Sequence, residues 1–135
     1  MRKSRLAGAA GALTAAGILA TTVVTQWEGI KLVAYRDIVG VPTVCVGETR
    51  GVKMGDRYTY DECMAMLAEG LREFETAMRA CLRNPDAIPD KPYAAFLSLS
   101  YNIGSGAFCR STVVRRANAG DLRGACDAIL MWNRA

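Results

Sequence analysis

The chain has 135 residues, a formal net charge of +4 and no histidine. This length fits one domain with a hydrophobic core, and the lack of histidine excludes Ser-His-Asp and Cys-His nucleophilic machinery and the commonest zinc sites. Acid–base chemistry must therefore fall mainly to carboxylates. Much of the net charge comes from the N-terminal tip, with Arg2, Lys3 and Arg5. The remainder has no basic stripe of the kind that nucleic-acid-binding proteins carry, so we expect no nucleic-acid partner, and we also expect no metal and no cofactor.

The N-terminal segment combines this basic tip with a charge-free run. Residues 6–26 carry no charge, and a run of this length can span a bilayer as a helix. The positive-inside rule would place the tip in the cytoplasm and the chain after Gln26 outside. The run is only weakly hydrophobic, because Ala, Gly and Thr dilute its large apolar residues. A cleaved signal peptide, a permanent anchor and a marginal anchor that inserts and later leaves are the three alternatives, and the composition favours the third.

The charge-free run ends at Trp27-Glu28-Gly29. A glycine after a helical run is a common stop, so Glu28 is predicted to lie at the very end of a helix. A carboxyl group beside the unsatisfied carbonyls of a helix end is suited to donate a proton, which is the task of a general acid. A second acid, Asp37, and a hydroxyl-bearing residue, Thr43, follow within the next 15 residues.

The rest of the pattern predicts a small β lobe followed by helices. Short β-prone pieces separated by glycine turns occupy residues 32–49, which favours an antiparallel meander. Thr59 and Glu62 form a capping box before a helix that ends near Leu82. Three further helices are predicted to run through residues 103, 117 and 132, behind caps at Asp90, Ser111 and Asp121. The predicted fold class is α+β, with a hydrophobic N-terminal helix before the β lobe and the mainly helical lobe.

Five cysteines are many for a chain of this size, and none of them forms a C-x-x-C pair. They are Cys45, Cys63, Cys81, Cys109 and Cys126. Two disulfides with one leftover thiol would indicate an oxidising compartment such as a periplasm. Buried free thiols are the alternative.

The spacing of the two acids and the threonine has a counterpart in a known family. Glu28-Gly29 is followed by Asp37 nine residues after the glutamate, and by Thr43 six residues further on. A distal block adds Tyr101-Asn102-Ile103-Gly104, Phe108, Ser111-Thr112 and Asn118-Ala119-Gly120-Asp121. In these residues the chain resembles phage-type lysozymes, the endolysins of glycoside hydrolase family 24, and in particular their signal-arrest-release members. The likeness covers nearly everything from Trp27 onward, with departures at Glu48, where the family often has histidine, and at Pro42, where an aromatic residue is frequent.

The resemblance implies a lysozyme-like fold and a muramidase that hydrolyses the β-1,4 bond between N-acetylmuramic acid and N-acetylglucosamine in peptidoglycan. Glu28 would protonate the leaving oxygen, while Asp37 and Thr43 would position a water on the other face of the sugar. Such a reaction inverts the anomeric carbon, and inverting carboxyl pairs stand about 6.5–9.5 Å apart. The expected cleft-lining residues are Tyr35, Glu48 and Asn102.

The resemblance also bears on the cysteines and on the C-terminal end. Family members often carry a last cysteine in helices that would follow Ala135, so we expect this chain to be incomplete and Cys126 to be unpaired. The expected disulfides are then Cys45–Cys63 and Cys81–Cys109.

We expect two parts, a signal-anchor segment in residues 1–26 and a lysozyme-like domain in residues 27–135 that acts on glycan strands as a monomer. Residues 6–26 would first hold the domain on the periplasmic side of the host inner membrane. Once released, the same residues would form the first helix of the soluble domain and bring Glu28 to Asp37. The segment contains no cysteine, so refolding rather than disulfide exchange would be the route. The alternative is a catalytically inactive, membrane-tethered protein with the same fold that binds peptidoglycan or another partner.

Overall fold

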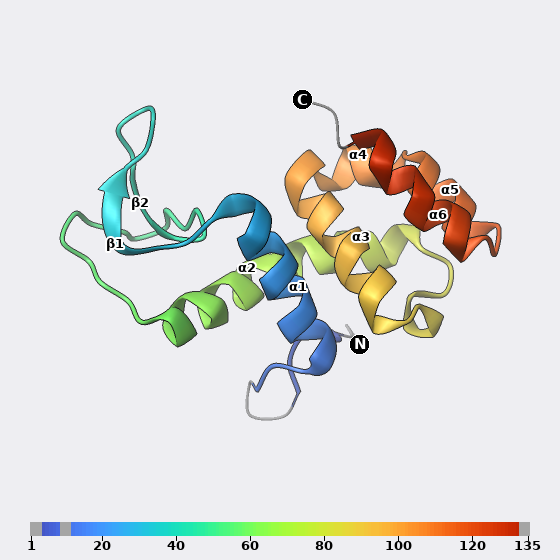
Figure 1. Cartoon of the computed structure of the whole chain (residues 1–135), viewed down its shortest axis with the longest axis horizontal. Helices are drawn as coiled ribbons and strands as arrows, with labels where there is room; N and C mark the ends of the chain where they lie inside the picture. Colours follow the sequence, from blue (N-terminus) through green and yellow to red (C-terminus); the bar gives the residue numbers. More distant parts are fainter. Residues whose placement is uncertain (1–3, 9–11, 133–135) are drawn as a thin grey trace.

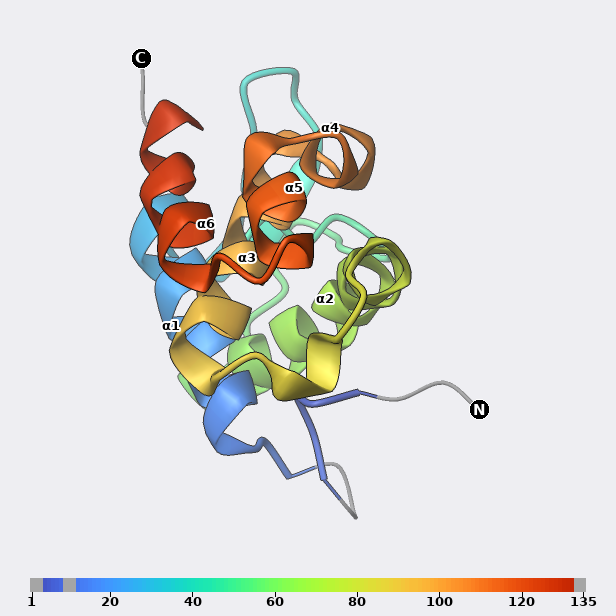
Figure 2. The same cartoon turned by 90° about the vertical axis from the view of Figure 1, so that its right-hand side faces the viewer.

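The computed structural model describes residues 4–8 and 12–132. A two-stranded sheet lies at one end of the molecule, most of the helices lie at the other, and the long helix α2 (Tyr60–Cys81) runs between them (Figure 1). Helices α4, α5 and α6 gather on the side away from the sheet and come to the front when the molecule is turned (Figure 2). The α+β class and the small β lobe beside a mainly helical lobe are confirmed.

The sheet consists of β1 (Lys31–Arg36) and β2 (Pro42–Cys45), which are antiparallel and place Tyr35 opposite Thr43. The hairpin turn includes Gly40 at a φ of 88°, a conformation that favours glycine. The expected meander is therefore shorter than predicted. Beyond β2, the described residues add single bridges rather than a further strand, at Val44↔Glu48 and Val33↔Arg57.

The cap predictions depend on local sequence, and most are confirmed. The Thr59 hydroxyl accepts from the Glu62 amide at 3.1 Å, and the Glu62 carboxylate accepts from the Thr59 amide at 2.7 Å. Ser111 and Asp121 also cap their helices. The prediction for Asp90 is wrong by one residue, because Asp90 is already the first helical residue and Pro89 takes the cap position.

The helical lobe contains one element that the sequence did not predict. Gly104 ends α3 (Asp90–Ile103) as expected, but a short helix, α4 (Ser105–Cys109), follows at once instead of a loop. The remaining helical elements are α5 (Thr112–Asn118), α6 (Leu122–Ile129) and the 3₁₀ helices η2 (Pro85–Ala87) and η3 (Leu130–Trp132).

The N-terminal helix is shorter than expected. Helix α1 (Ala15–Glu28) begins at Ala15 because Thr14 caps it, its hydroxyl accepting from the Gly17 amide at 3.1 Å. Before it the chain folds back, with the Thr14 amide donating to the Leu6 carbonyl at 3.0 Å. No helix within residues 4–8 and 12–132 is long and apolar enough to cross a membrane. Arg2 and Lys3 of the basic tip, residues 9–11 of the charge-free run and residues 133–135 lie outside the described residues.

Helix α3 lies at the centre of the core, and α1 packs along it. The α3 side chains of Tyr93, Phe96 and Leu97 are completely buried. Helix α1 turns a small-residue face inward, where Ala16 and Ala20 are buried. This packing fixes the axis of α1 and therefore the place where its last residue, Glu28, meets the β lobe.

Two disulfides tie the lobes to α2. Cys45–Cys63 joins the end of β2 to the first turns of α2, and Cys81–Cys109 joins the last residue of α2 to α4. Cys126 is a free, partly buried thiol. These are the two pairs and the unpaired cysteine that we expected.

Candidate active site

Glu28 is the last residue of α1, and its side chain is exposed. The chain leaves the helix through Gly29, which has a φ of 78° and whose amide donates to the Thr25 carbonyl at 2.8 Å. A side chain at position 29 would strain this backbone, so glycine allows the abrupt change from helix to strand. Glu28 therefore stands where α1 meets the sheet, as the sequence predicted.

Asp37 follows β1 and is held by the hairpin turn. Its Oδ1 accepts from the amides of Val39 at 2.9 Å and Val41 at 2.8 Å, and its own amide donates to the Val41 carbonyl at 3.0 Å. These two backbone donors hold one oxygen of the carboxyl group in place. Within the described chain, Oδ2 has no hydrogen-bond donor and remains available to a ligand or water.

Thr43 is buried on β2, and its hydroxyl donates to the Val41 carbonyl at 2.9 Å. The same carbonyl accepts from the Asp37 amide. The Val41 peptide therefore brings Asp37 and Thr43 together. Because the Thr43 hydroxyl uses its proton in this bond, its oxygen can accept a hydrogen bond from another group.

Glu48 closes the tight turn that follows β2, in which Cys45 and Gly47 both have positive φ. Its Oε1 accepts from the amides of Thr49 and Arg50, both at 3.1 Å. The turn borders a cavity of about 480 Å³, whose other walls come from α2 and the end of α3. Among the residues that line this cavity are Glu48, Arg50, Glu73, Phe74 and Tyr101.

Tyr101 lines this cavity from the end of α3. Burial raises the pKa of its phenol above the ordinary value, and the negative charges of Glu28 and Glu48 raise it further. The ring packs edge-on against Phe74 at 5.1 Å between centroids, and the hydroxyl donates to the Val46 carbonyl at 3.3 Å.

The other expected cleft residues are placed differently. Tyr35 is exposed on β1 opposite Thr43, beside the Asp37 turn. Asn102 is exposed and lines a separate hollow of about 190 Å³, together with Trp27 of α1 and Trp132 of η3. In the described residues there is no cluster of side chains suited to hold a metal ion.

The arrangement can be compared with known proteins. Residues 25–135 match the model of the family described as Phage lysozyme. The chain belongs to this family. Among its relatives, the SAR-endolysin of Pseudomonas phage phiKMV is 37% identical over 129 residues, which cover 96% of this chain and 75% of the relative. The SAR-endolysin of Enterobacteria phage P21 is 39% identical over 109 residues, or 80% of this chain and 65% of the relative.

A solved structure agrees with the fold. A mutant of P22 lysozyme superposes with a TM-score of 0.76 at 36% identity, covering 86% of this chain and 82% of that structure. The chain described here spans about two thirds of the length of the P21 relative.

One residue of the site was missed by the sequence reasoning. Tyr101 and Asn102 are neighbours in the distal family block, and the expected cleft-lining residues included Asn102 but not Tyr101. Neighbouring residues on a helix point in different directions, and here Tyr101 lines the cavity of about 480 Å³ whereas Asn102 lines the hollow of about 190 Å³. Tyr101 therefore lies beside Glu48, which borders the same cavity. The signal was the periodicity of α3, since Tyr101 lies four residues after the buried Leu97.

Proposed function

We propose that this phage lysozyme is an endolysin, a muramidase that hydrolyses the β-1,4 bond between N-acetylmuramic acid and N-acetylglucosamine in the peptidoglycan of a host bacterium. The observation that carries the proposal is the pairing of Asp37 and Thr43 through the Val41 peptide. This pairing leaves one carboxylate oxygen and one hydroxyl oxygen able to hold a water. Glu28 stands on a different element, at the end of α1, and can approach the substrate from another side.

The mechanism assigns one step to each group. Glu28 donates its proton to the glycosidic oxygen as the bond to the anomeric carbon breaks. A water held by Asp37 and Thr43 attacks that carbon from the opposite face and gives its proton to the Asp37 carboxylate. The products are two glycan chains with inversion at the anomeric carbon, and the water requires about 6.5–9.5 Å between the carboxyl groups.

The assignment is tested on peptidoglycan gels with the full chain. Glu28→Gln and Asp37→Asn should each lower clearing by about 100-fold or more, because each removes an acid–base group. Asp127→Asn, an exposed carboxylate on α6, should clear like the unmodified chain. Clearing by Glu28→Gln would defeat the assignment. No clearing by the unmodified chain, together with binding to the gel, would favour the inactive binding protein instead.

We further propose that residues 6–26 first anchor the protein in the host inner membrane, with the N-terminus in the cytoplasm and the domain in the periplasm. The protein then leaves the bilayer as a monomer and adopts the conformation described above. The SAR-endolysin of phage phiKMV, which aligns with 96% of this chain, supports the proposal. The division at residue 26 applies to the anchored form, because α1 crosses that boundary once it has folded onto α3. If collapse of the membrane potential left all of the protein in the membrane fraction, release would be excluded.

A further inference from the structure

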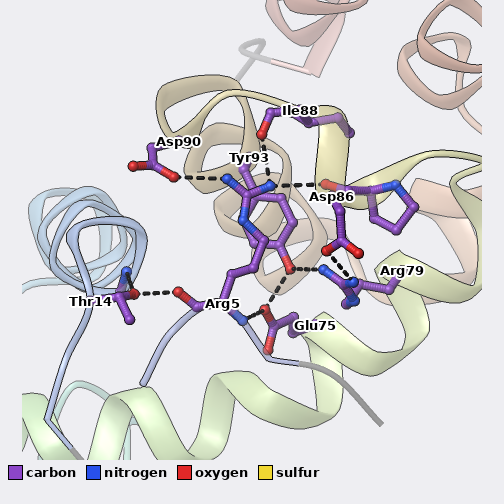
Figure 3. Close-up of polar contacts among 10 residues, drawn as sticks. Arg5, Thr14, Glu75, Arg79, Asp86, Ile88, Asp90 and Tyr93 are labelled. Carbon is purple, nitrogen blue, oxygen red and sulfur yellow. Dashed lines mark hydrogen bonds and ion pairs between the residues drawn. The ribbon is translucent and has the colours of Figure 1, made fainter. Parts of the chain in front are cut away.

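Arg5, from the basic tip, lies in a polar site between η2 and α3 (Figure 3). Its Nη1 donates to the carbonyl oxygens of Pro85 at 2.9 Å and Ile88 at 2.7 Å. Its Nη2 donates to Asp90 Oδ1 at 2.8 Å, and the guanidinium carbon lies 4.1 Å from the centroid of the Tyr93 ring. Three acceptors and an aromatic face satisfy the guanidinium in a way that a surface arginine seldom achieves.

The backbone of Arg5 completes a second part of this site. Its amide donates to Glu75 Oε2 at 2.9 Å, and the same oxygen accepts from the Tyr93 hydroxyl at 2.5 Å. Arg79 donates in turn to the Tyr93 hydroxyl at 3.0 Å. Glu75 is only 1% exposed, so this carboxylate depends on its donors. Without the N-terminal segment it would lose one of them, which is costly for a buried carboxylate.

The segment is held on the other side by α1. Leu6 is 1% exposed, the Arg5 carbonyl accepts a hydrogen bond from the Thr14 hydroxyl, and the Leu6 carbonyl accepts from the Thr14 amide at 3.0 Å. The chain crosses α1 directly above Gly17, where a Cβ atom would overlap the Leu6 carbonyl. Glycine at position 17 is therefore required for this docking.

We propose that Arg5 has two successive roles, first as the cytoplasmic charge that holds residues 6–26 in the membrane and then as a lock that prevents their return. We call its binding site the Arg5 socket: Glu75, Tyr93, Asp90 and the carbonyls of Pro85 and Ile88. The proposal rests on the membrane release proposed above. To leave the bilayer, a charge at the cytoplasmic end of residues 6–26 must cross the hydrocarbon core, which makes release slow. To reinsert, the same charge must leave the socket, expose Leu6 and deprive Glu75 of a donor.

The lock makes release directional without any change in the covalent structure. The anchored form has the Arg5 socket empty, and the released form fills it with a residue that is already covalently attached. A segment of marginal hydrophobicity could otherwise exchange between bilayer and protein. The socket biases that exchange towards the protein, because it recognises only the released conformation.

Two glycine variants test the docking with the same change in composition. Gly17→Ala and Gly8→Ala each add one methyl group to the run, but Cβ at Gly8 has its nearest neighbours at 3.9 and 4.0 Å. In the soluble protein, trypsin should cleave after Arg5 about tenfold or more faster in Gly17→Ala than in Gly8→Ala or the unmodified chain, since cleavage follows the undocked population. The new N-terminus at Leu6 is identified by mass.

Charge and shape at Arg5 are separated by Arg5→Lys, which keeps the membrane-anchoring charge but loses the planar fork. It should leave the membrane as slowly as the unmodified chain, yet show faster cleavage after residue 5 and a smaller soluble fraction. Asp90→Asn and Glu75→Gln alter the socket alone and should act in the same direction.

The outcomes distinguish the lock from the enzyme. If Gly17→Ala and Arg5→Lys match Gly8→Ala in both cleavage and soluble fraction, the lock is wrong, whatever the lytic activity. Protection of Arg5 in a chain that clears no peptidoglycan would refute the muramidase and leave the docking in place. A protein that never occurs in the membrane fraction would overturn the first of the two roles.

Discussion

The Cys45–Cys63 disulfide is expected to support catalysis as well as stability. Cys45 lies two positions after Thr43 and three before Glu48, and its bond to Cys63 anchors this turn to α2. Cys45 has a φ of 59°, a left-handed conformation that costs a non-glycine residue about 1–2 kcal/mol. When both cysteines are replaced by alanine, the crosslink that holds residue 45 is gone. Residue 45 can then relax to the extended region, and the turn should move.

The two disulfides provide a matched comparison. The pair Cys45–Cys63 closes a separation of 18 residues, for which chain entropy predicts a loss of about 3 kcal/mol on removal. The separation of 28 residues for Cys81–Cys109 gives about 0.4 kcal/mol more. Relaxation of residue 45 returns about 1–2 kcal/mol in the first variant. The Cys45→Ala, Cys63→Ala variant should therefore lose no more free energy of unfolding than the Cys81→Ala, Cys109→Ala variant, measured by urea titration with circular dichroism.

Their lytic activities should nevertheless differ. At a temperature where both variants remain folded, Cys45→Ala with Cys63→Ala should lose about tenfold or more in the rate of peptidoglycan clearing, because small displacements of positioning groups are expensive in rate. Cys81→Ala with Cys109→Ala should stay close to the unmodified chain. Cys45→Gly with Cys63→Ala accepts the positive φ without strain, so it should regain activity but not stability. Full activity in the first variant, or no recovery in the glycine variant, would refute the reasoning.

Two further predictions concern buried hydroxyl groups. Burial and the hydrogen bond to Glu75 raise the pKa of Tyr93 above its ordinary value of 10.0. The folded state then holds this proton more tightly than the unfolded chain, so the contribution is present below about pH 10 and is lost as the pH rises further. Stability should decline less steeply above that pH in Tyr93→Phe, and parallel pH profiles would contradict the assignment. The Ser100 hydroxyl is buried and has no partner among the described residues. Ser100→Ala should raise the free energy of unfolding by up to about 1 kcal/mol, and a clear loss would mean that a bound water satisfies the hydroxyl.

The parts of the fold that follow from short stretches of sequence were predictable. Thr59 with Glu62, Ser111 and Asp121 each need only a neighbour three residues away to form a cap. The spacing of the candidate catalytic residues is local in the same sense, since all three lie on one helix end and the hairpin that follows it. Asp90 was misplaced by one position because Pro89 can supply the carbonyl to the Tyr93 amide at 3.0 Å without a side-chain cap.

The parts that depend on distant residues were not predictable. The groups that accept hydrogen bonds from the Arg5 amide and guanidinium lie 70 to 85 residues away in the chain, and no periodicity in the first 26 residues points to them. The length of α1 was missed for a related reason. An uncharged run rich in Ala, Gly and Thr is compatible with a weakly hydrophobic membrane span. It is equally compatible with a helix that packs closely against another helix. Only the cap at Thr14 and the crossing of Leu6 over Gly17 decide where the helix begins.

The same small residues therefore serve both proposed states of the N-terminal segment. Ala16 and Ala20 are 3% and 0% exposed, and larger side chains there would hold α1 away from α3. In a bilayer those residues contribute little to insertion, where even leucine or isoleucine gains only about 0.3–0.6 kcal/mol. Small side chains on this face of α1 therefore weaken membrane insertion, and the same small side chains allow close packing against α3. Because Glu28 ends the same helix, the packing that is proposed to draw this segment out of the membrane would also set the position of the proposed acid.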